Sequence, residues 1–210
     1  MRMISVVCGV VVAAAVCGGC LQKEVGQTIY IGPSGAVWTV IETDVRSDET
    51  EPASRIREEQ DYALAARAGQ HGVARAFRSL GAQSVTTTWL RRERPYSVMT
   101  EARFGDVRQL AMALLRGAKI QGEVTLVREG CRTKFGVRVN LESAPEPDGD
   151  SPLDELLAEL EHYRVVLSEG RFISADGFEI LGEGSIAVPD KNKTATDGIL
   201  SLALVWDEGC

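Results

Sequence analysis

Residues 27–45 read QTIYIGPSGAVWTVIETDV, and this stretch decides the class of fold that the chain can adopt. Residues 27–31 alternate weakly between apolar and polar side chains, which is typical of a β-strand. A Gly-Pro-Ser-Gly sequence at 32–35 then predicts a turn, because glycine and proline favour the backbone angles that turns require. The alternation resumes over residues 36–45, with Trp38 among the side chains of one face. The stretch therefore predicts a β-hairpin.

The same alternation recurs outward from this hairpin, in short segments separated by turns. Strands are expected at residues 85–89, 96–104, 120–128, 133–141, 163–167, 171–174, 178–181, 185–188 and 199–206. In residues 133–141 apolar side chains alternate with polar ones, which indicates an antiparallel sheet with one solvated face. Residues 199–206 are apolar on both faces, which is typical of a central or doubly covered strand.

Two further segments have helical composition. Residues 52–80 are rich in Ala, Arg, Glu and Leu, although Gly69 and Gly72 are expected to kink or divide this helix. A shorter helix is expected to start at Ser151, because Pro152 suits the first turn of a helix.

The clearest helical pattern covers residues 106–116. Apolar side chains recur there at the spacing of one helix face: Val107, Leu110, Ala111 and Leu114. Asp106 and Gln109 form a capping-box pattern at the start of the helix. The order of strands and helices along the chain predicts a single α+β domain, a mostly antiparallel sheet with about three helices packed on one face.

The N-terminus has the pattern of an export signal. The positively charged start Met1-Arg2-Met3 precedes an apolar run at residues 4–16, which is too short to span a bilayer and is typical of a signal peptide. Gly18-Gly19-Cys20 follows, and this sequence resembles the end of the lipobox of bacterial lipoproteins, in which a small residue precedes the lipidated cysteine. Cys17 departs from the pattern, because leucine is commonest at that position.

This resemblance implies cleavage before Cys20 and acylation of its thiol, and two or more acyl chains anchor a protein stably to a membrane. The chain would then divide into a signal peptide at 1–19, a lipidated N-terminus and short tether at 20–26, and an envelope domain at 27–210. Leu21 stands where an Asp often retains lipoproteins at the inner membrane, which favours the outer membrane, facing the periplasm. The alternatives are an uncleaved helix and an ordinary signal peptide.

Cys131 and Cys210 are left as a pair once the leader is removed and Cys20 is acylated. The oxidising cell envelope favours a disulfide between them. Free thiols and an intermolecular bridge are the alternatives. Neither cysteine has a second cysteine nearby, so the sequence does not support CxxC redox chemistry or a zinc site.

Charge and motifs argue against several function classes. With 23 Lys and Arg against 30 Asp and Glu, the net charge of −7 does not suit a general nucleic-acid binder. The turn at 32–35 lacks the spacing of a serine-hydrolase nucleophile, and His71 and His162 are as consistent with a solvent-facing position as with a site. The neighbouring acids Glu58 and Glu59 are assigned to a solvated helix face. No catalytic residue, metal ligand or cofactor is assigned, and the protein is not expected to be an enzyme.

Arg91, Arg92 and Arg94 form the most distinctive surface feature, a basic tip on the hairpin of residues 85–104. Such a cluster close to a membrane can contact anionic headgroups or polyanionic envelope polymers. A solvated tip whose charges discourage edge pairing is the simpler interpretation.

The leading functional hypothesis is a non-enzymatic, membrane-anchored module that binds a lipid, a glycan or an envelope protein. The expected architecture resembles that of small bacterial lipoproteins of the LppM type. By this likeness, the sheet could form a concave lipid-binding groove. No sequence motif supports the likeness. One alternative is a scaffolding lipoprotein in which the Trp38 hairpin pairs with a partner strand. An unrecognised hydrolase is another. An apolar cavity under the sheet would favour the lipid-binding hypothesis.

Overall fold

The computed structural model describes residues 21–140, 163–190 and 192–209. Its strands are β1 (Leu21–Gly32), β2 (Gly35–Ser47), β3 (Ser84–Arg91), β4 (Tyr96–Phe104), β5 (Gly122–Glu129), β6 (Arg132–Asn140), β7 (Tyr163–Leu167), β8 (Arg171–Asp176), β9 (Phe178–Leu181), β10 (Ile186–Pro189) and β11 (Ile199–Asp207). Its helices are α1 (Pro52–Arg67), α2 (Gly72–Ser79) and α3 (Val107–Gly117), with a 3-10 turn at Gly182–Gly184. The helix expected from Ser151 lies outside the described residues.

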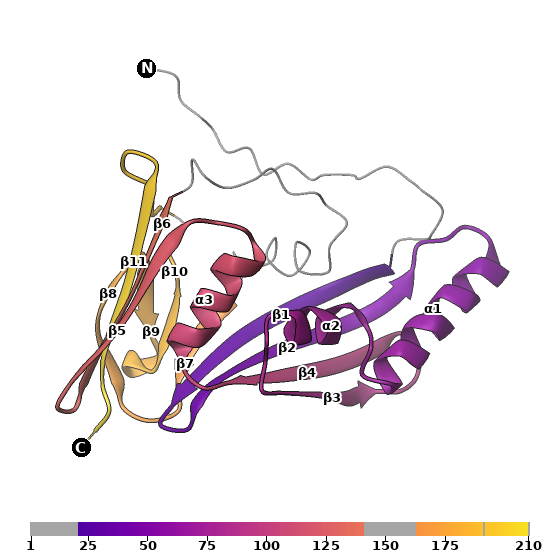
Figure 1. The fold of residues 1–210 in the computed structure, drawn as a ribbon. Helices are drawn as coiled ribbons and strands as arrows, with labels where there is room; N and C mark the ends of the chain where they lie inside the picture. The colour runs from indigo at the N-terminus through magenta and orange to yellow at the C-terminus, as the bar shows by residue number, and fades with distance from the viewer. Residues whose placement is uncertain (1–20, 141–162, 191, 210) are drawn as a thin grey trace.

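The described strands form two sheets (Figure 1). The larger has the order β3-β4-β2-β1-β7-β10-β9, and the smaller has the order β5-β6-β11-β8. Neighbouring strands run antiparallel except for β1 and β7, which are parallel. These findings confirm the predicted α+β class and its mostly antiparallel pairing, with the strands divided between two sheets. The doubly apolar strand β11 lies between β6 and β8, in the interior of the smaller sheet.

The hairpin predicted at residues 27–45 is the centre of the larger sheet. Trp38 pairs with Ile29 across the hairpin and is fully buried, where its indole nitrogen donates to the side chain of Gln27 at 3.1 Å. Both strands of the hairpin have a neighbour on each side, β4 next to β2 and β7 next to β1. The expectation that this hairpin presents apolar positions to a partner strand is therefore wrong, because no edge of it is free.

Strand β1 begins at Leu21, so the tether expected at residues 20–26 is wrong for residues 21–26. These residues pair with the second half of β2, from Leu21 opposite Ser47 to Gly26 opposite Ile41. Polar side chains and a glycine interrupt the alternation of apolar and polar residues here, so the sequence does not predict a strand. The backbone hydrogen bonds to β2 nevertheless hold the segment in the sheet.

The predicted helix at residues 52–80 is divided at the glycines, as expected. Helix α1 ends at Arg67, and the left-handed glycine Gly69 follows, whose amide donates to the carbonyl of Ala66 at 3.0 Å. Helix α2 then begins at Gly72. Helix α1 contacts β2, and α2 contacts β3 and β4.

Helix α3 begins as the capping-box pattern predicts. The backbone amide of Gln109 donates to the carboxylate of Asp106 at 2.7 Å, and the Gln109 side chain accepts from the amide of Gly105 at 3.2 Å. The helix contacts β5 of the smaller sheet as well as β2 and β4 of the larger one, and it lies between the two sheets in Figure 1. Its apolar stripe therefore faces the space that the two sheets enclose.

Candidate functional site

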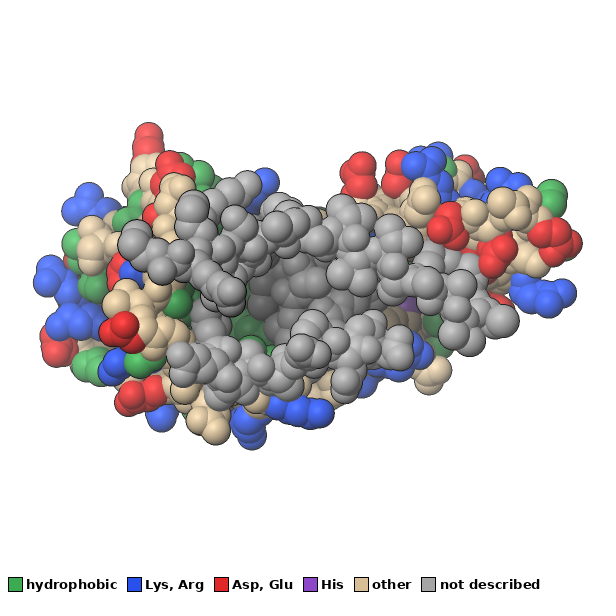
Figure 2. Space-filling model, turned by 90° about the horizontal axis from the view of Figure 1, so that it is seen from above, with side chains coloured by type: hydrophobic (Ala, Val, Ile, Leu, Met, Phe, Trp, Pro, Cys, Tyr) green, Lys and Arg blue, Asp and Glu red, His purple; other side chains and the backbone are tan. Residues whose placement is uncertain are grey.

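An apolar cavity of about 300 Å³ lies between the two sheets, beside α3. This volume is at the lower end of the range of small-molecule pockets. The described residues that line it belong to six strands and helices and to the segment after α3: Ile29, Ile31, Val107, Leu110, Ala111, Leu114, Leu115, Ala118, Ile120, Phe135, Val137, Val139, Tyr163, Val165, Phe178, Leu200, Leu202 and Leu204. Seen from above in Figure 2, hydrophobic side chains are visible near the middle of the molecule, between its two ends.

The cavity wall consists of side chains whose periodicity is visible in the sequence. All four residues of the predicted α3 stripe, from Val107 to Leu114, line the cavity. Three alternate residues of β6 line it from the opposite side: Phe135, Val137 and Val139. The sequence pattern predicted that these faces are buried. The pattern did not predict that a cavity remains between the apolar faces of α3 and β6, because the space between them depends on how the two sheets are placed.

Tyr163 supplies the hydroxyl group in this wall, and the other described lining side chains are purely apolar. Its ring contacts Phe178 edge to face, with ring centroids 6.3 Å apart. Burial raises the pKa of the Tyr163 hydroxyl well above its usual range, so the group is neutral at physiological pH. None of the described residues hydrogen-bonds this hydroxyl. The wall of the cavity thus includes one residue with a neutral hydroxyl.

A second feature is a buried polar cluster around Glu42, at the other half of the larger sheet. The Glu42 carboxylate is 1% exposed and contacts three side chains from β1, α1 and the start of α2. They are the Lys23 ammonium at 3.0 Å, the Tyr62 hydroxyl at 3.1 Å and Nε2 of His71 at 3.3 Å. His71 Nε2 also lies 2.9 Å from the hydroxyl of Thr100 on β4. No sequence motif indicates this cluster, because its members are far apart in the chain.

Opposing effects set the pKa of Glu42. Burial alone raises it, but the hydrogen bond from His71 and the charges of Lys23 and His71 together outweigh burial. The pKa of the Glu42 carboxyl is therefore lowered, and the group is ionised at neutral pH.

The geometry of this cluster does not match that of a nucleophilic triad. In a triad one imidazole nitrogen contacts the nucleophile while the other contacts the acid. Here Thr100 and Glu42 both approach Nε2, and Nδ1 of His71 has no hydrogen-bond partner among the described residues. The hydroxyl-bearing Thr100 is also fully buried. The cluster therefore joins β1, β2, β4, α1 and α2 through polar contacts in the interior.

The three arginines of the predicted basic tip have different surroundings in the structure. Arg94 forms an ion pair with Glu59 of α1, whereas Arg91 donates to the backbone carbonyl of Arg94 at 3.4 Å and Arg92 is exposed. Glu59 is only 2% exposed, so its assignment to a solvated helix face is wrong. The carboxylate is stable there because Arg94 and the amide of Ser47, at 3.1 Å, both contact it.

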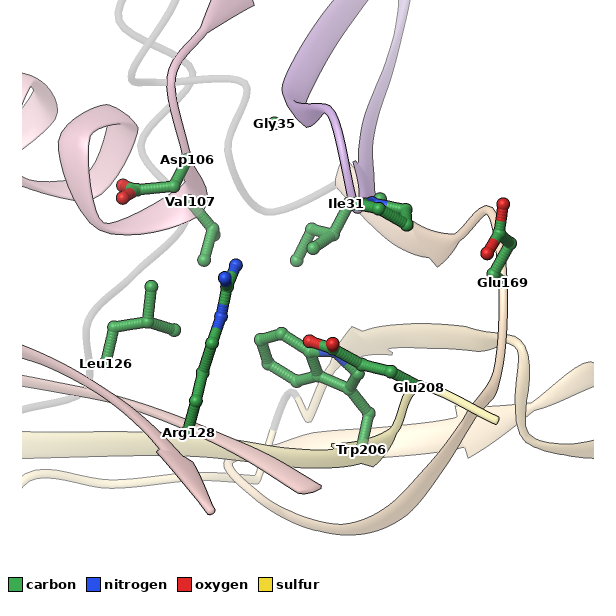
Figure 3. A pocket seen from close by; sticks show the side chains of 11 residues that line it. Ile31, Gly35, Asp106, Val107, Leu126, Arg128, Glu169, Trp206 and Glu208 are labelled. Carbon is green, nitrogen blue, oxygen red and sulfur yellow. The ribbon is translucent and has the colours of Figure 1, made fainter. Parts of the chain in front are cut away.

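A smaller pocket lies where the β1–β2 turn meets the second sheet (Figure 3). The long side chain of Arg128 extends from β5 into it, between Asp106 at the start of α3 and the ring of Trp206. Its volume of about 20 Å³ is close to that needed for one water molecule. It is therefore too small to hold a ligand.

Two residues of the predicted sites, Cys20 and Cys210, lie outside the described residues. The proposed Cys131–Cys210 disulfide therefore stays a prediction. A hydrogen bond of 2.8 Å from the amide of Glu208 to the carbonyl of Cys131 brings the C-terminal segment to the start of β6.

Within the described ranges, no group of three or more His, Cys, Asp or Glu side chains is arranged to hold a metal ion. None of the helices in the same ranges combines the length and the apolar character that crossing a membrane requires.

No protein-family model matches the chain, and no curated protein matches it. Among solved structures, the chain is similar to the LppM protein folded domain of Mycobacterium tuberculosis, with 15% identity over 92% of this chain and 93% of that one and a TM-score of 0.37. It is also similar to the Mu homology domain of Fcho1 from Danio rerio with bound Eps15 peptide, with 8% identity over 90% and 80% of the two chains and a TM-score of 0.19. At TM-scores this low, neither likeness bears on function.

Proposed function

We propose that this protein is a bacterial envelope lipoprotein, anchored through Cys20, whose domain binds the acyl chain of a lipid in the cavity between its two sheets. The observation that carries the proposal is the cavity of about 300 Å³ and its apolar wall. An apolar group that moves from water into such a wall gains roughly 25 cal/mol for each Å² of surface buried. The proposed role is binding and not catalysis.

The character of the wall favours a lipid over a glycan. A glycan carries many hydroxyl groups, and each one that is buried without a hydrogen bond costs about 1–3 kcal/mol. Among the described lining residues only Tyr163 has a polar side-chain atom. An acyl chain needs no polar partner, and the Tyr163 hydroxyl would donate to an ester or carboxyl oxygen at the end of that chain.

The bound lipid is proposed to be a molecule other than the anchor itself. Ile29 and Ile31 line the cavity from the far end of β1, whereas Leu21, next to Cys20, begins the strand. At about 3.3 Å per residue, Ile31 lies about 33 Å along the strand from Leu21, and Tyr163, which pairs with Gln27, lies about 20 Å along it.

A photoreactive fatty acid fed to cells that express the full chain tests this proposal. We expect crosslinks in peptides of α3, β6 or β11, separate from the label that acylation adds at Cys20. Ala111→Phe places a large ring in the cavity and should reduce these crosslinks several-fold, because the ring occupies the space of the ligand. Met112→Phe, on the exposed face of the same helix, is the matched control and should leave them unchanged.

Two results would count against the proposal, and each addresses a different part of it. Crosslinks that are absent from cavity peptides, or equal in both variants, would exclude acyl-chain binding in the cavity. If a Cys20→Ser chain were acylated and membrane-bound to the same extent as the wild type, the assignment of Cys20 as the anchor would be wrong.

A further inference from the structure

A third pocket, of about 270 Å³, lies at the other end of the larger sheet, and three arginine side chains are in its lining. Arg46 near the end of β2, Arg55 in the first turns of α1 and Arg94 in the β3–β4 hairpin line it together with Ser47, Glu59 and Pro95. Only Arg94 belongs to the predicted basic tip. The β2–α1 connection places Arg46 and Arg55 in the same pocket. No sequence pattern predicts this placement.

The pocket carries more positive charge than its own carboxylate neutralises. Glu59 is engaged by Arg94 and by the amide of Ser47. Arg46 and Arg55 form no ion pair in the part of the chain that the structure describes. The neighbouring acids Glu58 and Glu51 accept from the hydroxyls of Ser47 and Ser54, and among the described residues neither forms an ion pair with Arg46 or Arg55. Two guanidinium groups thus remain available to an anion.

The strand register places this pocket beside the start of the domain. Ser47 pairs with Leu21, and Arg46 pairs with Gln22. Leu21 is the residue that follows Cys20, so an acyl anchor on Cys20 would hold the pocket next to the membrane surface. Figure 2 shows charged side chains of both signs gathered at this end of the molecule, where Figure 1 places α1.

We propose that Arg46 and Arg55, with Arg94 beside them, bind the phosphate of an anionic phospholipid headgroup in the membrane that carries the anchor. Guanidinium groups suit this role because they donate two parallel hydrogen bonds to phosphate oxygens. The inference rests on the proposed anchor at Cys20, but it does not depend on whether the cavity binds a lipid.

Headgroup binding would give the domain a defined orientation. A flexible acyl anchor alone leaves the domain free to rotate, whereas a second contact beside it fixes which end meets the bilayer. The apolar cavity, about 20–33 Å further along β1, would then be held away from the surface that carries the anchor.

Chemical modification of arginine tests this inference on the full, lipidated chain. The protein is reconstituted in vesicles of phosphatidylcholine alone or of an equimolar mixture with phosphatidylglycerol, and its binding to both is first verified by sedimentation. Uncharged phenylglyoxal then modifies the arginines, and mass spectrometry gives the rate at each residue. Arg138, exposed on β6 of the other sheet, is the internal control.

We expect Arg46 and Arg55 to react roughly five-fold more slowly in the anionic vesicles, because each basic side chain near anionic headgroups gains about 1 kcal/mol. Arg138 should react equally in both. Equal rates at Arg46 and Arg55 in the two vesicles would overturn the proposal. So would equal protection by inorganic phosphate in phosphatidylcholine vesicles, since the site would then take free phosphate. Neither result depends on crosslinking in the cavity, so the two proposals fail separately.

Discussion

At the scale of single residues, Glu42 shows how a buried carboxylate is kept charged. Its partners Lys23, Tyr62 and His71 come from three places in the chain, which explains why sequence periodicity could not predict the cluster. Periodicity indicates which face of an element is buried, not which polar groups meet there. His71 illustrates the same limit. It precedes α2 and was as consistent with solvent as with a site, yet it is 2% exposed.

Glu42→Gln should lower the free energy of unfolding at pH 7 by about 1–3 kcal/mol, because the buried Tyr62 hydroxyl and the His71 ring lose an ionised hydrogen-bond partner. The folded-state pKa of Glu42 lies below its usual value of 4.5, so its contribution is present above that value and is lost as pH falls through the folded-state pKa. Chemical denaturation at a series of pH values measures both effects. The acid-dependent loss of stability should be shallower in this variant than in an exposed control, Glu123→Gln. Identical pH dependence in both variants would refute the charged state assigned to Glu42.

At the scale of elements, local chemistry was largely predictable. The β1–β2 hairpin, the cap of α3 and the division of the first helix at its glycines follow from turn, capping and glycine rules that act over a few residues. The start of β1 was mispredicted because residues 21–26 owe their strand conformation to pairing with β2. Pairing of that kind is set by distant residues.

The two glycines between α1 and α2 should respond in opposite ways to alanine. Gly69 has a φ of +63°, which disfavours a side chain, so Gly69→Ala should destabilise the protein by about 1 kcal/mol. Gly72 has an ordinary φ, and an added Cβ meets nothing within 4 Å, so Gly72→Ala should stabilise it by about 0.4–1 kcal/mol. Denaturant unfolding measures both, and effects of the same sign would contradict the assigned helix boundary.

At the scale of the whole molecule, the two sheets and α3 enclose the cavity, and β1 spans the distance from the proposed anchor to that cavity. The sequence predicted the apolar faces of α3 and β6. It could not predict that these faces enclose a space, because a cavity depends on the relative placement of all the elements around it. The arginine pocket eluded prediction for the same reason, since Arg46 and Arg55 lie on elements that no motif connects.

Native mass spectrometry of the full chain, released intact from its own membranes, tests the central claim most directly. Acyl-chain binding in the cavity predicts one additional lipid mass per chain, beyond the covalent acylation at Cys20, in the wild type and in Met112→Phe. The additional mass should be absent in Ala111→Phe, whose ring fills the space. A wild-type chain with no additional lipid mass, or an Ala111→Phe chain that retains it, would contradict the claim that the cavity binds a lipid.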